Sequence, residues 1–261
     1  MNLQNNNEKI NEEKRIDKKS VGSIRIVWIA FLTGLYTFVS SMKIILASLF
    51  FKNNRKHIDK YMLQWANNIL GSIQLSLRVI GQENLNVKKD TPVIVMCNHS
   101  SLYDIPVAIQ ALNTSFRFVA KKEMFKIPVL GTAIKHAEFI SIDRKNHEQA
   151  LKDLVKAKEK MLDGITLWVA PEGTRSKDGK ISKFKKGGFH IALDTNATII
   201  PIVIKDIHKV QAGDQMKISV GQTIDVEICK PIDSKNYTHE KRKQLIDDVR
   251  STMMKALEQY I

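Results

Sequence analysis

Cysteine is scarce in this chain, with only Cys97 and Cys229 among its 261 residues. Two cysteines so far apart cannot form the disulfide framework of a small secreted protein, and their scarcity fits a reducing cytoplasm. Because Cys97 ends an apolar run, we interpret it as a small core residue rather than as a nucleophile.

Acidic residues are also in deficit. The chain has 27 Asp and Glu against 41 Lys and Arg, which gives a formal net charge of +14 at pH 7. This excess predicts a partner or surface of opposite sign, such as nucleic acid or anionic lipid. The sequence lacks zinc-ligand spacing, the aromatic signature of RNA-binding domains and a basic helix with base-reading residues. We therefore expect lipid, and neither nucleic acid nor a metal ion.

Charge is absent from residues 26–42, and a second apolar run covers residues 44–51 beyond Lys43. Residues 1–20 before them are polar and lysine-rich, with no small-x-small cleavage pattern, and are expected to form a solvated leader. A single helix over residues 26–51 would measure about 39 Å. It could cross a hydrocarbon core of about 30 Å, but Lys43 would then lie in or near the lipid.

Lysine and arginine flank this apolar region on both sides, so both flanks look cytoplasmic under the positive-inside rule. A segment that enters and leaves the lipid from one side satisfies both flanks. We therefore predict a monotopic helical pair bent near Ser40 and Ser41, which anchors the chain through residues 24–51 at the cytoplasmic face of the cell or inner membrane. A simple span and a buried helix of a soluble domain are the alternatives.

Apolar runs and helical patterns alternate from residue 61 onward, which indicates an α/β fold with a largely parallel sheet covered by helices on both faces. Strands are expected at residues 77–80, 93–96, 116–120, 138–142, 165–170, 198–204, 216–220 and 223–228. Helices are expected at residues 61–75, 129–136, 147–162 and 189–193. Two more are expected after the strand at residues 93–96 and from about residue 239.

Residues 98–104 read Asn-His-Ser-Ser-Leu-Tyr-Asp and follow a predicted buried strand. Residues five apart on a helix are rotated by roughly 140° and cannot face each other. His99 must therefore lie in the turn before a helix, with Asp104 in or near its first turn and able to reach back. Asp104 would then fix the imidazole while His99 takes a proton from an alcohol. The alternative is a helix cap, with Ser100 or Ser101 at the N-cap and Asp104 complementing the helix dipole.

Three further blocks follow residues 98–104 in order. They are Lys121, Lys122 and Glu123 through Pro128 and Gly131 to Phe139, Ile142, Asp143 and Arg144; residues 171–176; and Ile200, Pro201 and Ile202. With the first block, which includes Asn98 and Ser101, they make the chain resemble the 1-acylglycerol-3-phosphate acyltransferase family of glycerolipid acyltransferases, which carries an NHxSxxD motif. One residue departs from the family pattern, because Glu138 stands where the family usually has glycine.

The resemblance implies that the last blocks bind a phosphate-bearing acceptor. A phosphate is well bound by the planar guanidinium group of arginine and by backbone N–H groups that come close to it. Arg144 and Arg175 are therefore the candidate phosphate-binding side chains, and Gly173 would let the backbone approach the phosphate. Glu172 could orient Arg175 or bind an acceptor hydroxyl. Salt bridges to Asp143 or Glu172 are the structural alternative for the arginines. Thr174 and Lys122 complete the predicted substrate site, and Pro201 is expected to shape an edge or loop nearby.

The implied reaction moves an acyl group from acyl-coenzyme A or an acyl carrier protein to the sn-2 hydroxyl of lysophosphatidic acid, and gives phosphatidic acid with no cofactor. We expect residues 1–57 to form a leader and membrane-anchoring helices, and residues 58–261 the catalytic domain. Two alternatives stay open: an acyltransferase for another lysolipid or lyso-aminolipid, and a catalytically silent basic membrane-binding protein.

Overall fold

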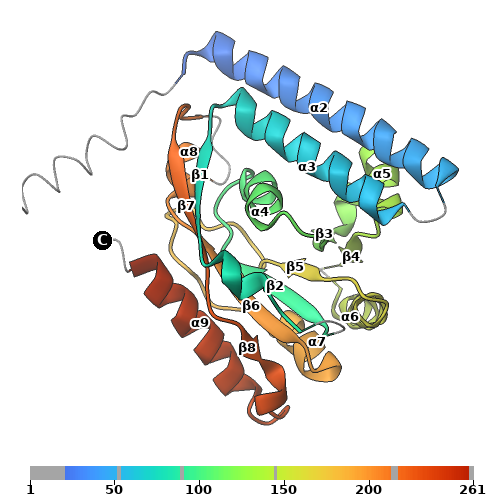
Figure 1. The fold of residues 1–261 in the computed structure, drawn as a ribbon, viewed down its shortest axis with the longest axis vertical. Helices are drawn as coiled ribbons and strands as arrows, with labels where there is room; N and C mark the ends of the chain where they lie inside the picture. Colours follow the sequence, from blue (N-terminus) through green and yellow to red (C-terminus); the bar gives the residue numbers. More distant parts are fainter. Residues whose placement is uncertain (1–20, 52–53, 89–90, 144–145, 213–216, 259–261) are drawn as a thin grey trace, which may run out of the picture.

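The computed structural model describes residues 21–51, 54–88, 91–143, 146–212 and 217–258. It forms one sheet with helices on both faces (Figure 1). The helices are α2 (Ser23–Phe50), α3 (Arg55–Ser72), α4 (Asp104–Leu112), α5 (Leu130–His136), α6 (His147–Leu162), α7 (Gly187–Thr195), α8 (Ile207–Val210) and α9 (Arg242–Glu258). The strands are β1 (Ser76–Ile80), β2 (Val93–Cys97), β3 (Arg117–Lys121), β4 (Ile140–Ile142), β5 (Leu167–Val169), β6 (Thr198–Ile204), β7 (Thr223–Ile228) and β8 (Ile232–Asp233).

The strand order is β1-β7-β6-β2-β5-β3-β4, and β8 pairs with β6 beside this path. Pairing is parallel across β6, β2, β5, β3 and β4, and antiparallel where β6 meets β7 and β8. The predicted α/β class is therefore confirmed. Because the central strands are parallel, the loops that follow β2 and β5 emerge at the same edge of the sheet, which is where such folds place their ligands.

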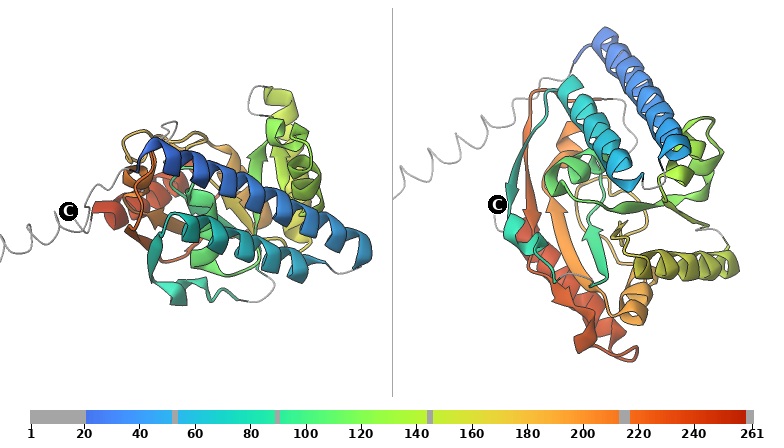
Figure 2. Two further views of the ribbon diagram at one scale, coloured as in Figure 1. Left: turned by 90° about the horizontal axis from the view of Figure 1, so that it is seen from above. Right: turned by 45° about the vertical axis from the view of Figure 1, so that its right-hand side comes forward.

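Alternation along the strands builds a core on each face of the sheet. In β2, Val95 and Cys97 join the cluster under α3 and α4, whereas Ile94 and Met96 join the cluster under α7 and α9. Side chains that alternate in this way explain why the central strands read as continuous apolar runs. Figure 2 shows α2 and α3 together on one side and α9 on the other.

Helix α2 is unbroken from Ser23 to Phe50, so the predicted bend near Ser40 and Ser41 is wrong. Both serines are buried in α2, which packs along α3 and α5. Their small side chains allow close approach between helices instead of interrupting the hydrogen-bond ladder. Thr37 anchors the same contact, because its hydroxyl accepts a hydrogen bond of 3.1 Å from the indole N–H of Trp65 on α3.

The outer side of α2 is apolar and exposed, so the helix is not buried in a soluble core. Among the described residues it is the helix whose length and composition would allow it to cross a membrane, and only 22% of its most apolar window is buried. Lys43 lies on its inner side, where it donates to Gln64 and sits 5.8 Å from the ring centre of Tyr61. The exposed large side chains include Ile24, Val27, Trp28, Phe31, Leu35, Phe38, Leu46, Leu49 and Phe50.

Most predicted elements are present, but residues 217–220 form no strand, and Met216 lies outside the described residues. Only Ser219 makes a bridge there, through its N–H to the carbonyl of Val210 at 2.8 Å. The short alternating pattern of this run was therefore not enough to place it in the sheet. The proposed division at residue 57 stays a prediction.

Glu138 has φ +61°, in the left-handed region that favours glycine. Its carboxylate accepts hydrogen bonds from Arg55 Nε at 2.6 Å and from Lys160 Nζ at 2.9 Å. These contacts offset a backbone cost of about 1–2 kcal/mol. The hydrogen bond from Arg55 is the main reason that the pKa of Glu138 falls from 4.5 to about 2. Glu138, which stands where the resembled family usually has glycine, thus links the start of α3 to the segment just before β4.

Candidate active site

His99 lies in the turn after β2, and Asp104 is the first residue of α4. The distance between His99 Nδ1 and Asp104 Oδ2 is 2.6 Å. A carboxylate only accepts hydrogen bonds, so Nδ1 is the donor, and in the neutral ring this tautomer leaves the lone pair on Nε2. The imidazole is about one-fifth exposed, whereas Asp104 is fully buried. The predicted geometry is confirmed, and it leaves a basic nitrogen available to a substrate.

Asp104 also holds the turn that precedes its helix. The same Oδ2 atom accepts the N–H groups of Ser100 at 2.7 Å and Ser101 at 2.9 Å. The alternative of Ser100 or Ser101 as N-cap is wrong, because the N-cap residue is Tyr103 and no side chain caps the helix, although Asp104 does lie in its first turn. Since one carboxylate oxygen binds both the turn and the ring, the turn also fixes the direction from which His99 is held.

Glu172 and Ser176 hold the main chain of His99. Glu172 Oε1 accepts the His99 N–H at 3.1 Å, and Ser176 N–H donates to the His99 carbonyl at 2.7 Å. The other oxygen of Glu172 accepts from the N–H and the hydroxyl of Ser182, each at 2.8 Å. Glu172 is 2% exposed and forms no salt bridge with Arg175 in the described part of the chain. It positions His99, a role that the sequence did not predict.

Asn98 ties the end of β2 to the end of β6. Its amide nitrogen donates to the carbonyl of Ile204 at 3.0 Å, and its amide oxygen accepts the Ile204 N–H at 2.8 Å. This paired contact replaces a backbone ladder step between two strands just before His99. Asn98 is thus a structural member of the motif.

Ser101 contacts a residue that the sequence did not reveal. Its hydroxyl donates to Gln211 Oε1 at 3.2 Å, and the same oxygen accepts the N–H of Leu102 at 3.3 Å. Gln211 follows α8 and is separated from Ser101 by 110 residues. No motif surrounds Gln211, so only the folded structure brings it to the turn.

Gly173 and Arg175 lie in the loop after β5. Gly173 has φ +75°, and its N–H donates to the carbonyl of Ala170, so glycine is required by the turn. Thr174 is exposed. The Nη1 atom of Arg175 is buried and has no hydrogen-bond partner among the described residues. An unsatisfied guanidinium nitrogen costs free energy unless a ligand or water binds it, which makes Arg175 the anion-binding candidate in the loop after β5.

Lys122 is paired with Asp143 at 2.5 Å, and this hydrogen bond raises its pKa. Asp143 in turn accepts the N–H of Asn146 and donates its own N–H to Asp153. Lys122 is half exposed, and the charge of Asp143 already offsets part of its own charge. Arg144 lies outside the described residues, so its predicted place in the clamp stays a prediction.

Pro201 lies inside β6, an interior strand, so the expected edge or loop position is wrong. Its partner in β2 is Met96, and its carbonyl accepts the N–H of Cys229. The nitrogen and carbonyl of one residue point to the same side of a strand. The missing N–H of Pro201 therefore faces the interval between β7 and β8, where no ladder bond is lost.

Trp168 and Cys97 form part of the buried floor beneath the motif. The ring of Trp168 meets the His99 ring edge-on, with 6.3 Å between centroids. Cys97 is fully buried, and burial, helped by the charges of Asp104 and Glu172, raises the pKa of its thiol well above the ordinary value. The thiol thus stays protonated, which agrees with the prediction of a core residue.

Comparisons with known proteins match the region that contains these site residues. The family model described as Acyltransferase matches residues 76–205. The chain is 30% identical over 182 residues to a chloroplastic 1-acyl-sn-glycerol-3-phosphate acyltransferase of Arabidopsis thaliana, covering 70% of this chain and 49% of that protein. It is 31% identical over 188 residues to the 1-acyl-sn-glycerol-3-phosphate acyltransferase of Saccharomyces cerevisiae, covering 71% of this chain and 61% of that protein. The chain thus spans between 49% and 61% of the length of these two relatives.

A solved structure agrees over almost the whole chain. The crystal structure of the 1-acyl-sn-glycerophosphate acyltransferase PlsC from Thermotoga maritima superposes with a TM-score of 0.77 at 25% sequence identity. The match covers 91% of this chain and 96% of that one. The ordered motifs, the family model and this fold lead to one conclusion: the chain belongs to the acyltransferase family, among the relatives of the 1-acyl-sn-glycerol-3-phosphate acyltransferases.

Proposed function

We propose that this protein transfers a fatty acyl group from an acyl thioester to the sn-2 hydroxyl of lysophosphatidic acid, and so forms phosphatidic acid. One observation carries the proposal: the turn that holds the His99–Asp104 pair is hydrogen-bonded through Ser176 to the loop that carries Arg175, whose guanidinium has a buried nitrogen without a partner among the described residues. The pair supplies a base, and the guanidinium suits a phosphate. The names of the relatives supply the acceptor.

In this mechanism His99 Nε2 removes the proton of the acceptor hydroxyl as its oxygen attacks the thioester carbonyl. Asp104 stabilises the imidazolium through Nδ1. When the tetrahedral intermediate collapses, the carbon–sulfur bond breaks and the imidazolium returns its proton to the leaving thiolate. The products are the new ester and a free thiol, and no cofactor or covalent enzyme intermediate is needed.

The acceptor phosphate is bound by Arg175, with Lys122 and Arg144 as further cations. Gly173 contributes through the turn of the loop that carries Arg175, and Thr174 lies exposed in the same loop. Because Lys122 is already paired with Asp143, it contributes less attraction than an unpaired lysine would. Binding the phosphate on one side of His99 holds the hydroxyl near Nε2, which is the positioning that catalysis requires.

The exposed apolar side of α2 lies in the lipid, with the catalytic domain on the cytoplasmic face. This placement is supported by the large hydrophobic side chains on that side and by the basic flanks of the segment. An acyl donor and a lysolipid both partition to such a surface. The donor is either acyl-coenzyme A or an acyl carrier protein.

Incubation of the detergent-solubilised protein with acyl-coenzyme A and a panel of lysolipids, followed by mass spectrometry, tests the proposal. We expect phosphatidic acid from lysophosphatidic acid and little product from lysolipids without a terminal phosphate. Product from a different lysolipid would keep the chemistry and change the acceptor. The absence of product with both acyl-coenzyme A and an acyl carrier protein donor would contradict the proposed function.

A further inference from the structure

A basic groove lies between the loop before α7 and the N-terminal half of α9. Its volume is about 490 Å³. Two acidic residues, Glu240 and Asp247, and two apolar residues, Phe184 and Ile246, also line it. The cations of this basic groove are Lys183, Lys186, Arg242, Lys243 and Arg250, with His239 at one end.

The positive charge of the basic groove is offset only in part, because Glu240 and Asp247 stand against five Lys and Arg side chains. Lys183, Lys186 and Lys243 form no salt bridge in the part of the chain that the structure describes. By contrast, Lys205 is paired with Glu227 at 2.7 Å. The lining residues also act on a neighbouring group: burial lowers the pKa of His190, and the charges of Arg242 and His239 lower it further.

The basic groove faces away from the side that carries α2. Helix α9 packs in the core cluster on one face of the sheet, whereas α2 packs in the cluster on the other face. Figures 1 and 2 show the two helices on opposite sides of the molecule. If α2 lies on lipid, this groove faces the aqueous phase, where it meets soluble anions instead of lipid headgroups.

A short chain of hydrogen bonds joins the basic groove to His99. Arg250 donates to the carbonyl of Ser182 at 3.4 Å and to that of Ile181 at 3.2 Å. Ser182 donates to Glu172, and Glu172 accepts the N–H of His99. A partner that binds in the basic groove therefore contacts Arg250, which is linked to the turn of His99 through Ser182 and Glu172.

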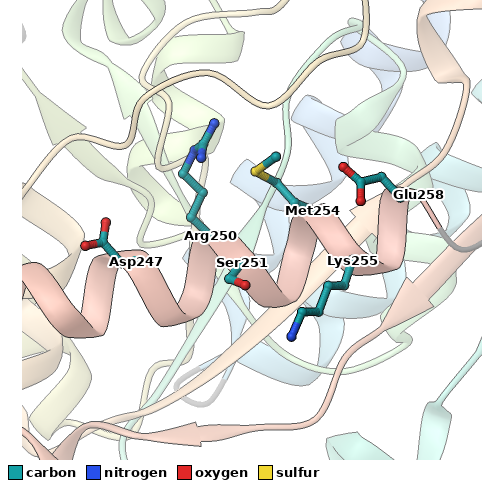
Figure 3. A pocket seen from close by; sticks show the side chains of 6 residues that line it. All are labelled: Asp247, Arg250, Ser251, Met254, Lys255 and Glu258. Atoms are coloured by element: carbon teal, nitrogen blue, oxygen red, sulfur yellow. The ribbon is translucent and has the colours of Figure 1, made fainter.

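The lining chemistry favours an acidic protein surface over a nucleotide. Phe184 is only 5% exposed and stacks on Phe189 at 6.2 Å, so it offers no open ring face to a purine. Cations spread over two chain segments, together with Ile246 in the same lining, fit an amphipathic helix that carries carboxylates. The hollow further along α9 is less suitable, because Asp247 and Glu258 balance Arg250 and Lys255 there (Figure 3).

We propose that the basic groove docks a small acidic carrier protein that presents the acyl thioester on its phosphopantetheine arm. This inference rests on the proposed acyl transfer and names its donor. Charge pairs at the rim of such a surface mainly increase the association rate and make binding sensitive to salt. The groove thus selects the carrier-bound donor, while His99 acts on the thioester carbonyl.

Two measurements on the full-length protein test the docking site. The first is binding of fluorescently labelled apo acyl carrier protein at low and high salt. The second is kcat/KM with acyl carrier protein and with acyl-coenzyme A as donors. The variant combines Lys183→Glu, Lys186→Glu and Lys243→Glu, and the control makes the same charge change with Lys152→Glu, Lys156→Glu and Lys255→Glu; all six lysines are exposed or half-exposed.

The groove variant should lose at least about tenfold in carrier-protein affinity and in kcat/KM with the carrier donor. Its kcat/KM with acyl-coenzyme A should stay within about twofold of wild type, and the control should match wild type with both donors. Equal losses with both donors, or equal losses in groove variant and control, would overturn the docking site. The docking site would also be overturned if the groove variant lost binding to anionic vesicles but kept binding to the carrier protein. If wild type turns over neither donor but still binds apo carrier protein through these lysines, the docking site stands and the proposed reaction fails.

Discussion

His99 and Arg175 lie on loops that contact each other, yet the protein treats the two side chains differently. Around His99, the ring, the N–H and the carbonyl all have protein partners, supplied by Asp104, Glu172 and Ser176. Around Arg175, one buried guanidinium nitrogen has no partner among the described residues. In the proposed mechanism, His99 is thus held in one orientation before substrate arrives, whereas Arg175 keeps its binding capacity for a charged ligand.

The largest effect should follow from Asp104→Asn, which keeps an oxygen for the turn but removes the charge of the carboxylate. The amide oxygen can still accept the N–H groups of Ser100 and Ser101 and the proton of His99 Nδ1. It carries no charge to stabilise the imidazolium that forms when His99 takes a proton. We expect kcat to fall by roughly 10²–10⁴-fold with little change in thermal stability. The exposed Asp247→Asn serves as the control, and unchanged turnover of Asp104→Asn would limit Asp104 to holding the turn.

Arg175→Lys tests the other side of the comparison. Lysine keeps the charge but loses the planar fork that binds a phosphate through two nitrogens. We expect KM for lysophosphatidic acid to rise about 10- to 100-fold while kcat stays within about threefold. Lys177→Arg, in the same loop, is the matched control. An equal fall in kcat with unchanged KM would show that Arg175 acts on the transition state and does not bind the ground-state phosphate.

Glu172→Gln should loosen the main chain of His99 without touching its ring. The glutamine oxygen can accept from either His99 or Ser182, and its amide group faces the remaining donor. We expect a loss of about 1–3 kcal/mol in unfolding free energy and a fall of about tenfold in kcat. Denaturant unfolding and steady-state kinetics measure the two effects, with the exposed Glu123→Gln as control. A variant as stable and as active as wild type would remove Glu172 from the support of His99.

Glu138→Gln should give the smallest effect, because Glu138 lies outside both regions and its carboxylate is one-fifth exposed. The pKa of Glu138 is lowered to about 2 by Arg55, so its stabilisation is complete above pH 4.5 and is lost as the pH falls toward 2. After allowance for solvent screening, we expect wild type to exceed the variant by about 1 kcal/mol at pH 7. The difference should shrink between pH 4.5 and 2. A difference that is independent of pH would contradict the ion-pair account.

Much of the fold could be predicted because its elements have strong local patterns. The apolar run of β6 and the amphipathic pattern of α6 gave the correct bounds, residues 198–204 and 147–162. Two serines in α2 suggested a bend that is not present, because their effect depends on whether a neighbouring helix packs on them. The run at residues 217–220 is too short for its pattern to decide whether it pairs.

The contact between His99 and Asp104 was predictable for a different reason. The five-residue spacing between His99 and Asp104 spans a strand-to-helix turn, so chain geometry alone brings them together. The partners of Glu172 and Ser101 were not predictable, because Ser182 and Gln211 reach the turn only through long-range packing. A buried glutamate beside a glycine turn gives no signal of which donor it will accept from.

The central claim is that His99 is the base, and the turnover of His99→Ala at saturating donor and lysophosphatidic acid tests it most directly. Our account predicts a kcat at least about 10²-fold below wild type, with thermal stability retained and with the exposed His136→Ala fully active. Full turnover by folded His99→Ala would contradict the account, since no other described group holds a free basic nitrogen at the end of β2.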